Sequence, residues 1–323
     1  MSRREEIIDF LGKDWDRVLD LIRSNLHSDV ALLEDTNDRI LSNSGKMLRP
    51  VVALLTARMI GPATEDSCRF AAASEMLHNA TLMHDDVADE SAERRGRPTL
   101  ASLLGPSAAV LVGDYWLARA VSVISVSEHH DDVIPLFART LTDLAEGEML
   151  QLEKASSADT TEEDYLRIIG CKTASLFSVA AETAAVSVAA TPEQQAAARA
   201  YGAAFGIAFQ IKDDILDYAG TDALGKPVGV DLKEQKITLP LLAAMEGSPR
   251  EAEIRAMVRD IPSHPEYCDA IRAFVAERDG IAIAYRRLEE WVDRAVKALD
   301  IFPDGTAKQM LSHIARFNLG REV

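Results

Sequence analysis

The chain has 323 residues, 47% of them hydrophobic and 27% charged, which is the composition of a folded globular protein rather than a disordered or collagen-like one. Its 35 Lys and Arg against 52 Asp and Glu give a net charge of −17, which argues against nucleic acid as a partner. Three scattered cysteines without a CxxC pair predict neither a disulfide framework nor a cysteine zinc site. Without a secretory signal or about 20 uninterrupted apolar residues, we expect a cytoplasmic protein with no transmembrane segment.

Apolar residues recur every three or four positions along almost the whole chain, which is the period of amphipathic helices. The predicted helices cover residues 5–24, 47–60, 66–88, 106–127, 132–153, 162–169, 173–189, 192–218, 237–246, 250–259, 265–278, 280–299 and 304–318. Prolines lie where several of them could begin, because the fixed φ and missing N–H of proline suit a first helical turn. Alternating β-branched runs are hard to find, so the sequence predicts an all-α protein.

The domain organisation follows from the same pattern. Segments 177–190 and 196–211 are apolar nearly all round, so they should lie inside a bundle rather than on its surface. The polar stretch 156–163 is a loop of ordinary length, and no Pro-, Gly- or Ser-rich linker divides the chain. We therefore expect a single domain over residues 1–323, built as one large helical bundle.

A DDxxD pattern occurs twice within predicted helices. The two triplets are Asp85, Asp86 and Asp89, and Asp213, Asp214 and Asp217. The first and last carboxylates of each triplet are four residues apart, so they share a helix face and repel each other unless a cation lies between them. An acidic chain can produce such strings on a solvated surface, but both triplets lie among apolar neighbours. Oxygen ligands without histidine or thiolate suit Mg²⁺, so the sequence predicts Mg²⁺ binding at both triplets.

The expected ligand of these metal sites is a diphosphate, because Mg²⁺ is usually shared between carboxylates and substrate phosphates. Basic residues that could bind it follow each triplet or precede the second: Arg94, Arg95, Lys172, Lys226 and Lys236. Segment 45–50 also places Lys46 and Arg49 at a loop-to-helix junction, where free backbone donors and the helix dipole favour phosphate.

The order and spacing of these motifs resemble those of the trans-isoprenyl diphosphate synthases. Segment 44–50 resembles their GGKxRP element, 75–99 their first aspartate-rich region and 209–241 their second, and the likeness runs from about residue 40 to 245. Within that family the chain is most similar to the long-chain polyprenyl diphosphate synthases of the octaprenyl kind. The resemblance implies an all-α bundle around a central cavity, Mg²⁺ as cofactor and a homodimer, with transient membrane association possible during product release.

The same resemblance implies a role for individual residues. The six aspartates match the Mg²⁺ ligands, and Lys172 joins them in catalysis. The positions that match the isopentenyl diphosphate site are Lys46, Arg49, His78 and Arg95. The positions that match the allylic diphosphate site are Arg94, Lys172, Thr173, Gln210, Lys226 and Lys236. Ser44 and Gln235 replace glycines of the family motifs, which affects loops more than ligands.

The implied reaction begins with the loss of diphosphate from the allylic substrate, helped by Mg²⁺ and the lysines. The isopentenyl double bond then attacks the allylic cation, and loss of a proton completes one elongation. Product length should depend on Ala80 and Thr81, just before the first triplet, and on Leu77 one turn deeper. Because Ala80 is small and no bulky aromatic residue lies there, we expect products longer than farnesyl.

Other functions remain as alternatives. A geranylgeranyl or other shorter-chain synthase would carry the same motifs, and a class I terpene cyclase would share one DDxxD site but not the second. Glu75 and His78 fit the Glu-x-x-His of di-iron bundles, although a second such motif is missing. His84 has no assigned role. Three residues suggest a polar patch on another predicted helix, which could face the site, although a solvated face is expected: Glu146, Glu148 and Gln151.

Overall fold

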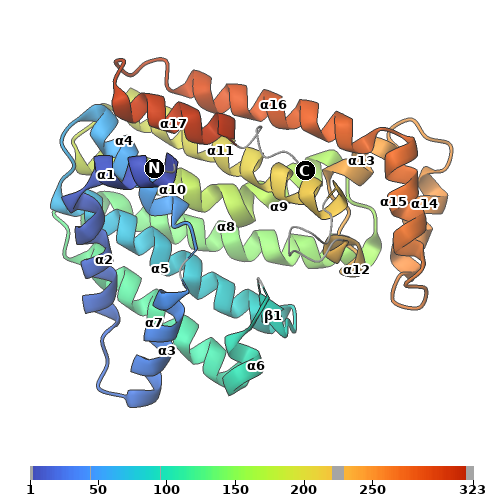
Figure 1. The fold of residues 1–323 in the computed structure, drawn as a ribbon, viewed down its shortest axis with the longest axis horizontal. Helices are drawn as coiled ribbons and strands as arrows, with labels where there is room; N and C mark the ends of the chain where they lie inside the picture. The colour runs from blue at the N-terminus through green and yellow to red at the C-terminus, as the bar shows by residue number, and fades with distance from the viewer. Residues whose placement is uncertain (1–2, 44, 95, 220–228, 318–323) are drawn as a thin grey trace. The chain divides into compact units, whose positions relative to one another are not determined.

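A computed structural model of the chain describes residues 3–43, 45–94, 96–219 and 229–317 (Figure 1). Helices make up nearly all of the described secondary structure, so the all-α prediction is confirmed. The helices are α1 (Arg3–Leu11), α2 (Lys13–Leu26), α3 (Ala31–Ser42), α4 (Leu48–Ile60), α5 (Glu65–Ala88), α6 (Leu100–Leu104), α7 (Pro106–Ser125), α8 (His130–Ser157), α9 (Glu162–Ile169), α10 (Ser175–Ser187), α11 (Pro192–Ala219), α12 (Val230–Lys233), α13 (Leu239–Met245), α14 (Glu251–Asp260), α15 (Tyr267–Glu277), α16 (Gly280–Ala298) and α17 (Thr306–Phe317). A π-helix, η1 (Gly170–Ala174), separates α9 from α10, and the strands β1 (Glu93–Arg94) and β2 (Arg97–Pro98) pair antiparallel.

The contacts within the chain divide it into two compact units. Unit 1 consists of residues 1–138, 176–202 and 299–311, and unit 2 consists of residues 139–175, 203–298 and 312–323. Helices α8, α11 and α17 contribute residues to both. Each unit is described by itself below, and the prediction of a single domain stays a prediction.

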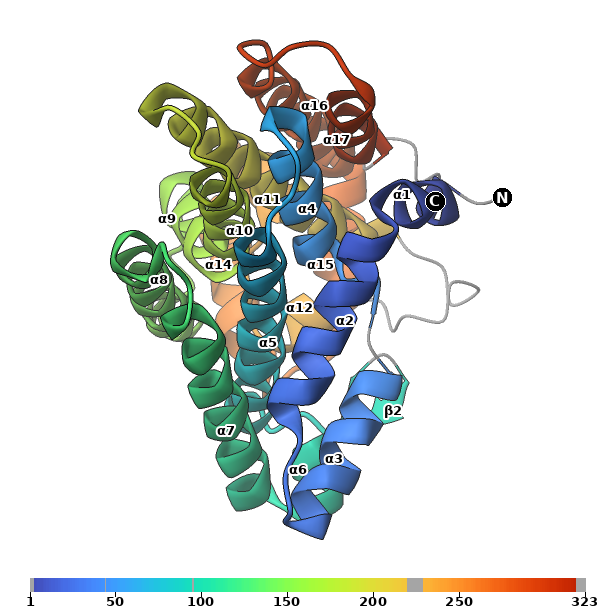
Figure 2. The same cartoon turned by 90° about the vertical axis from the view of Figure 1, so that its left-hand side faces the viewer.

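In unit 1, α5 is the central helix, with α2, α4 and α7 packed along it (Figure 2). Small side chains such as Ala71, Ala72 and Ala73 are fully buried on α5 and allow its neighbours to approach closely. At the other end of α5, a Cβ atom on Gly113 of α7 would lie 2.6 Å from Cδ2 of His84. His84, which has no role assigned in the sequence analysis, therefore packs against α7 rather than lying free in solvent.

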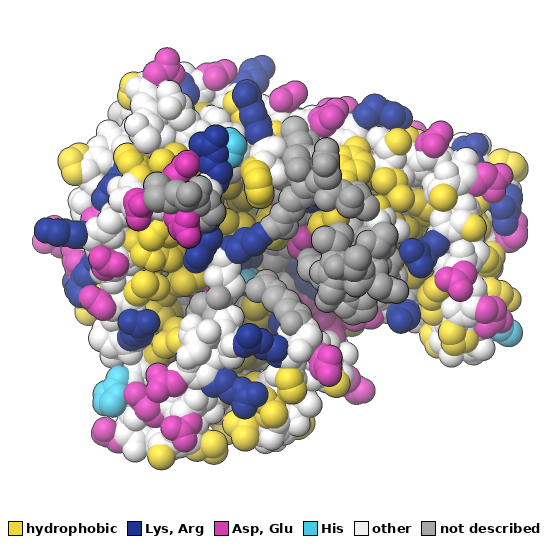
Figure 3. Space-filling view, viewed as in Figure 1, with side chains coloured by type: hydrophobic (Ala, Val, Ile, Leu, Met, Phe, Trp, Pro, Cys, Tyr) yellow, Lys and Arg dark blue, Asp and Glu magenta, His cyan; other side chains and the backbone are white. Residues whose placement is uncertain are grey.

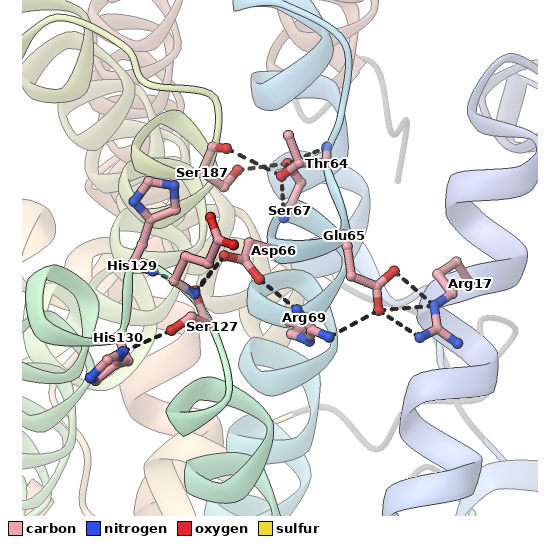
Figure 4. A network of polar contacts seen from close by, with 11 residues as sticks. Arg17, Thr64, Glu65, Asp66, Ser67, Arg69, Ser127, His129, His130 and Ser187 are labelled. Carbon is pink, nitrogen blue, oxygen red and sulfur yellow. Dashed lines mark hydrogen bonds and ion pairs between the residues drawn. The ribbon is translucent and has the colours of Figure 1, made fainter.

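A buried polar network fixes the start of α5 (Figure 4). The Thr64 side chain caps the helix by accepting a hydrogen bond from the Ser67 N–H at 3.1 Å, and the Ser67 and Ser187 hydroxyls lie 2.6 Å apart. The Ser127 hydroxyl, in the turn between α7 and α8, donates to Asp66 at 2.6 Å. Burial by itself would raise the pKa of Asp66, but its hydrogen bonds hold the pKa below the ordinary value. The network thus joins α5 to α10 and to the α7–α8 turn.

In unit 2, α13, α15 and α16 pack against one another. Gly280 begins α16 in close contact with the backbone of Pro240 in α13, where a larger residue would collide with the Pro240 carbonyl oxygen. Lys212 of α11 is buried, and its Nζ donates to the Tyr285 hydroxyl of α16 at 2.8 Å and lies 4.6 Å from the centre of the Tyr285 ring. The Lys212 stem thereby anchors α11 to α16.

The structure differs from the sequence prediction at several elements. The predicted helix 5–24 is divided at Gly12, whose φ of 49° interrupts the helix between α1 and α2. Helix α3 was not predicted, because its buried face includes the polar Asn37, whose Oδ1 accepts a hydrogen bond from the Trp116 indole at 2.8 Å. The predicted loop 156–163 is shorter, because α8 runs to Ser157 and Thr161 caps α9. The short elements β1, β2, α6 and α12 were not predicted, because they have too few residues to show a periodic pattern.

Helix α7 is the one element among the described residues that is long and apolar enough to cross a membrane by length and composition. The expectation of no transmembrane segment stays a prediction, because α7 meets the criterion by length and composition only. Helix α7 packs along α5 and α2, and its Tyr115 hydroxyl donates to the His27 carbonyl oxygen at 3.0 Å. One face of α7 is therefore packed against its neighbours, whereas Leu111 and Val121 on the helix are exposed.

Candidate active site

The first aspartate triplet lies at the end of α5 in unit 1. Asp89 is the C-cap residue, and its N–H donates to the Asp85 carbonyl oxygen at 2.8 Å, so Asp85 and Asp89 share a face one helical turn apart. Asp86 is buried and accepts a hydrogen bond from Arg94 Nε at 2.7 Å. Burial raises the pKa of Asp86, although the Arg94 charge acts in the opposite direction. The middle carboxylate is therefore held by Arg94, and Asp85 and Asp89 share another face of the helix.

The hairpin that follows α5 supplies that partner. Arg94 lies on β1, and the turn is closed by a hydrogen bond from the Thr99 hydroxyl to the Ser91 carbonyl oxygen at 2.7 Å. Gly96 has a φ of 71°, a left-handed conformation that suits glycine in a tight turn. Arg94, predicted at the allylic diphosphate, thus lies beside the first triplet and is paired with Asp86. Arg95 falls outside the described residues.

The start of α4 in unit 1 has the features of an anion site. Met47 is the N-cap residue in a left-handed conformation and provides no side-chain cap, so the first-turn N–H groups are not satisfied from that position. Lys46 is exposed just before it. The Arg49 guanidinium carbon lies 4.6 Å from the centre of the Phe177 ring, a cation–π contact that orients its side chain. Ser44 falls outside the described residues.

The residues predicted to control product length lie on α5 before the triplet. Ala80 and Leu77 are buried, and Thr81 is half-buried with its hydroxyl donating to the His78 carbonyl oxygen at 2.9 Å. His78, predicted at the isopentenyl diphosphate, is half-buried on the same helix. Glu75 is buried one turn earlier.

The second triplet lies near the end of α11 in unit 2. The Asp217 carboxylate accepts hydrogen bonds from the N–H groups of Val230 at 3.0 Å and Asp231 at 3.3 Å, which hold α12 back against α11. A carboxylate has about four lone-pair sites, so these two bonds leave capacity for a cation. Asp213, the first residue of the triplet, is half-buried.

Asp214, the middle residue, is buried, and each of its oxygens has a partner. The Tyr165 hydroxyl donates to Oδ2 at 2.6 Å, and Gln210 Nε2 donates to Oδ1 at 2.8 Å. Burial is the main cause that raises the pKa of Asp214 to about 7; the hydrogen bonds from Tyr165 and Gln210 act in the opposite direction, and the charges of Asp213 and Asp217 add to the rise. Both triplets therefore bury their middle aspartate against a protein donor.

The π-helix η1 presents the predicted diphosphate residues of unit 2. The Thr173 hydroxyl donates to Gln210 Oε1 at 2.8 Å, and Lys172 forms an ion pair with Glu148 of α8. A Cβ atom on Gly147 would lie 2.7 Å from the Cys171 Cβ, so this glycine allows α8 to approach η1. Glu148 was expected on a solvated face; that expectation is wrong, because its side chain is only 17% exposed and is paired with Lys172. Isolated π-helical turns occur frequently at functional sites.

The remaining predicted residues have different outcomes. Lys236 is half-buried beside Glu234, and its backbone N–H donates to the Asp231 carbonyl oxygen at 2.8 Å. Lys226 falls outside the described residues. Burial, and then the charges of Asp214 and Asp217, raise the pKa of Asp231 well above its ordinary value. Asp231 was missed, although it lies within the second region that the sequence had singled out.

Within the described residues, no three His, Cys, Asp or Glu side chains lie together as a ready-made metal site. The donor chemistry nevertheless fits Mg²⁺, because both triplets offer carboxylate oxygens on one helix face and no soft ligand. A cation held by one or two carboxylates and completed by phosphate oxygens, which is usual for Mg²⁺, requires no such three-residue group.

The chain thus carries two aspartate triplets on helices, with Arg94 paired to the first and the Gln210 amide bonded to the second. The chain belongs to the polyprenyl synthetase family, whose model matches residues 30–275. It is 38% identical to an octaprenyl diphosphate synthase of Haemophilus influenzae over 98% of this chain and 97% of that one. Among solved structures it is similar to a decaprenyl diphosphate synthase from Rhodobacter capsulatus, with a TM-score of 0.92 and 36% identity over 98% of this chain and 99% of that one. A polyprenyl synthase from Caulobacter crescentus, complexed with calcium and isoprenyl diphosphate, has a TM-score of 0.90 and 34% identity, covering 99% of this chain and 98% of that one.

The predictions of fold class, family and enzyme class are thereby confirmed. The chain is a trans-prenyltransferase of the isoprenoid synthase fold. The roles of individual site residues and the central cavity stay predictions.

Proposed function

We propose that this enzyme condenses isopentenyl diphosphate with an allylic prenyl diphosphate and elongates all-trans products of octaprenyl-like length. The observation that carries the proposal is the ordered set of donors around Asp214, which links the second triplet to Thr173 in the π-helix. These hydrogen bonds hold the Asp214 carboxylate and the Thr173 hydroxyl, which is proposed to bind phosphate, at fixed positions relative to each other. The octaprenyl and decaprenyl synthases to which the chain is similar support the long product.

The metal proposed for this enzyme is Mg²⁺, held by Asp85 and Asp89 of the first triplet and by Asp213 and Asp217 of the second, with Asp86 and Asp214 behind them. When bound, it supplies positive charge to the diphosphate that leaves the allylic carbon. Support comes from the oxygen-only donor sets and from the Caulobacter relative, which was solved with calcium and isoprenyl diphosphate.

The residues that bind the allylic substrate are proposed to be Lys172, Thr173 and Gln210, with Arg94, Lys226 and Lys236. Lys172 is half-buried and paired with Glu148, so its ammonium group is held in place before a diphosphate arrives. A cation fixed beside a leaving diphosphate stabilises the charge that develops on it without reorganisation in the transition state.

The residues that bind isopentenyl diphosphate are proposed to be Lys46, Arg49, His78 and Arg95. The uncapped start of α4 adds backbone N–H donors to the charges of Lys46 and Arg49. Holding the second substrate by its diphosphate directs its double bond at the allylic carbon, and such orientation can supply several kcal/mol of barrier reduction, up to about 10. Loss of a proton from the resulting carbocation to the released diphosphate then forms the new double bond, and the product keeps the diphosphate of the isopentenyl substrate.

A homodimer is proposed as the assembled form, with the outer face of α6 and α7 as the contact between two copies. Large apolar side chains are exposed there, including Leu104, Val110 and Val121, and Leu111 is 69% exposed. Apolar side chains are also visible where α3 and α6 lie (Figure 3). Exposed apolar faces of this kind are typical of interfaces. Light scattering should give a dimer for the unaltered chain, and Leu111→Asp should release monomers whereas Ile301→Asp, at another exposed apolar residue, should not.

A cytoplasmic location and transient contact with a membrane during product release are also proposed. The scattered free cysteines support a reducing compartment, and the apolar product supports the membrane contact.

The test of the proposed function is consumption of isopentenyl diphosphate by the purified enzyme. With farnesyl diphosphate and Mg²⁺ present, the proposal expects stoichiometric release of inorganic diphosphate and its loss when the metal is chelated. Release of diphosphate from the allylic substrate without consumption of isopentenyl diphosphate would instead indicate a terpene cyclase. No release from either substrate would refute the proposal.

A further inference from the structure

The chain of hydrogen bonds at the second triplet begins at a tyrosine that the family motifs do not include. Tyr165 lies in the first turns of α9, is buried, and its hydroxyl donates to Asp214 Oδ2 at 2.6 Å. Asp214 Oδ1 accepts from the Gln210 amide nitrogen, and the Gln210 amide oxygen accepts from the Thr173 hydroxyl, both at 2.8 Å. Four side chains from α9, η1 and α11 are thus joined in one line.

The direction of each donor in this line is determined by chemistry. The ionised Asp214 carboxylate only accepts, so in that form Gln210 must turn its NH₂ group toward Asp214 and its carbonyl oxygen toward Thr173. The Tyr165 hydroxyl occupies the other Asp214 oxygen and leaves only Oδ1 for Gln210. The orientation of the Gln210 amide therefore depends on where the Asp214 carboxylate is held.

Tyr165 is itself firmly placed. Thr161 and Asp164 form a capping box at the start of α9, and Lys154 of α8 binds Asp164 at 3.0 Å. Arg255 of α14 donates to the carbonyl oxygen of Thr160 at 3.1 Å. These contacts fix the first turn of α9, so the hydroxyl of Tyr165 reaches Asp214 from a rigid support.

We propose that Tyr165 is a positioning residue for the condensation, which acts through Asp214 and Gln210 to hold the Thr173 hydroxyl in place for the allylic diphosphate. The inference rests on the proposed function and deepens it. Without the phenol hydroxyl, the Asp214 carboxylate loses one of two donors and turns, and the Gln210 amide turns with it. Thr173 then no longer has a fixed acceptor, so its hydroxyl is not oriented toward the substrate.

The test compares Tyr165→Phe with Tyr201→Phe. Tyr201 is also buried, and its hydroxyl donates a hydrogen bond to the Leu311 carbonyl oxygen at 2.9 Å. Both variants lose a single buried hydroxyl, so their melting temperatures should fall by similar amounts. The kcat of Tyr165→Phe should fall about tenfold, which corresponds to a loss of about 1.4 kcal/mol of transition-state stabilisation. The KM for isopentenyl diphosphate should stay within about twofold, whereas Tyr201→Phe should keep its kcat within about twofold.

A second readout does not depend on turnover. Farnesyl thiolodiphosphate with Mg²⁺ should raise the melting temperature of the unaltered enzyme and of Tyr201→Phe, and it should raise that of Tyr165→Phe by less than half as much. In an Asp214→Ala background, adding Tyr165→Phe should change neither this shift nor kcat, because the two residues act in series.

The outcomes separate the two proposals. Equal kcat and equal melting shifts for Tyr165→Phe and Tyr201→Phe would overturn the positioning role while the unaltered enzyme still condenses the substrates. A full additional loss from Tyr165→Phe in the Asp214→Ala background would also overturn it. Failure of the unaltered enzyme to consume isopentenyl diphosphate would refute the proposed function instead.

Discussion

The close contact between α10 and α11 in unit 1 provides a prediction that links packing to the substrate site. A Cβ atom on Gly202 of α11 would lie 2.7 Å from both the Phe177 carbonyl carbon and the Ser178 Cα, and nearer still to the Phe177 carbonyl oxygen. All three are backbone atoms and cannot turn away. In Gly202→Ala, the two helices must therefore move apart by about 0.7 Å or more to reach an ordinary van der Waals separation of about 3.4 Å.

The magnitude follows from two opposing effects. Overpacking of this kind costs about 1–3 kcal/mol, and replacing a helical glycine by alanine returns up to about 1 kcal/mol. A net loss of about 2 kcal/mol corresponds to a fall in Tm of roughly 3 °C for a chain of this size. Because Arg49 stacks on the Phe177 ring at 4.6 Å, the same shift should raise the KM for isopentenyl diphosphate.

The assay is thermal unfolding followed by steady-state kinetics, with Gly305→Ala as the control, since a Cβ there meets nothing within 4 Å. The control should keep both Tm and KM. A Gly202→Ala variant with the Tm of the unaltered chain would refute the packing argument. A lowered Tm with an unchanged KM would refute the connection from Phe177 to Arg49.

Three further predictions concern single residues. Asp85→Ala should lower kcat by about 100-fold or more if Asp85 is a metal ligand. The Tm should change little, because Asp85 is half-buried at the end of α5. Retained Mg²⁺-dependent turnover would count against its role as a metal ligand. The pKa of Asp214 is about 7 in the folded chain and about 3.9 in the unfolded chain, so the folded state binds the proton more tightly. The free energy of unfolding of the metal-free enzyme should therefore fall by up to about 4 kcal/mol between pH 4 and pH 7. Melts in the presence of a chelator should show no such pH dependence for Asp214→Asn, and a stability that rises with pH in the unaltered enzyme would contradict the argument. Burial raises the pKa of the Cys68 thiol to about 12, so iodoacetamide at pH 8 should label the half-buried Cys268 well before Cys68. Peptide mass spectrometry measures the two labelling rates. Equal rates would contradict the prediction and would show that α5 opens readily.

The fold class and the places of the two triplets could be predicted because both depend on short-range pattern. Spacing alone puts Asp85 and Asp89 on one helix face, and the helical hydrogen bond between them agrees. The burial of the middle carboxylates, Asp86 and Asp214, against protein donors could not be predicted. Their partners Arg94 and Tyr165 come from other elements, which the spacing within one helix does not reveal.

Long-range polar pairing limited the prediction elsewhere as well. Helix α3 was missed because Asn37 looks like a surface residue until the Trp116 indole is brought to it. Glu148 looked solvated for the same reason, since its partner Lys172 lies in a π-helix that no periodic pattern reveals. Hydrophobic spacing predicts which elements exist, whereas buried polar pairs depend on how those elements meet.

The most direct test of the central claim is the length of the product. Purified enzyme with labelled isopentenyl diphosphate, farnesyl diphosphate and Mg²⁺ should yield mainly products of octaprenyl-like length after chromatography, and Ala80→Phe should shorten them because Ala80 is small and buried before the first triplet. Release of geranylgeranyl or shorter chains alone from the unaltered enzyme would contradict the account.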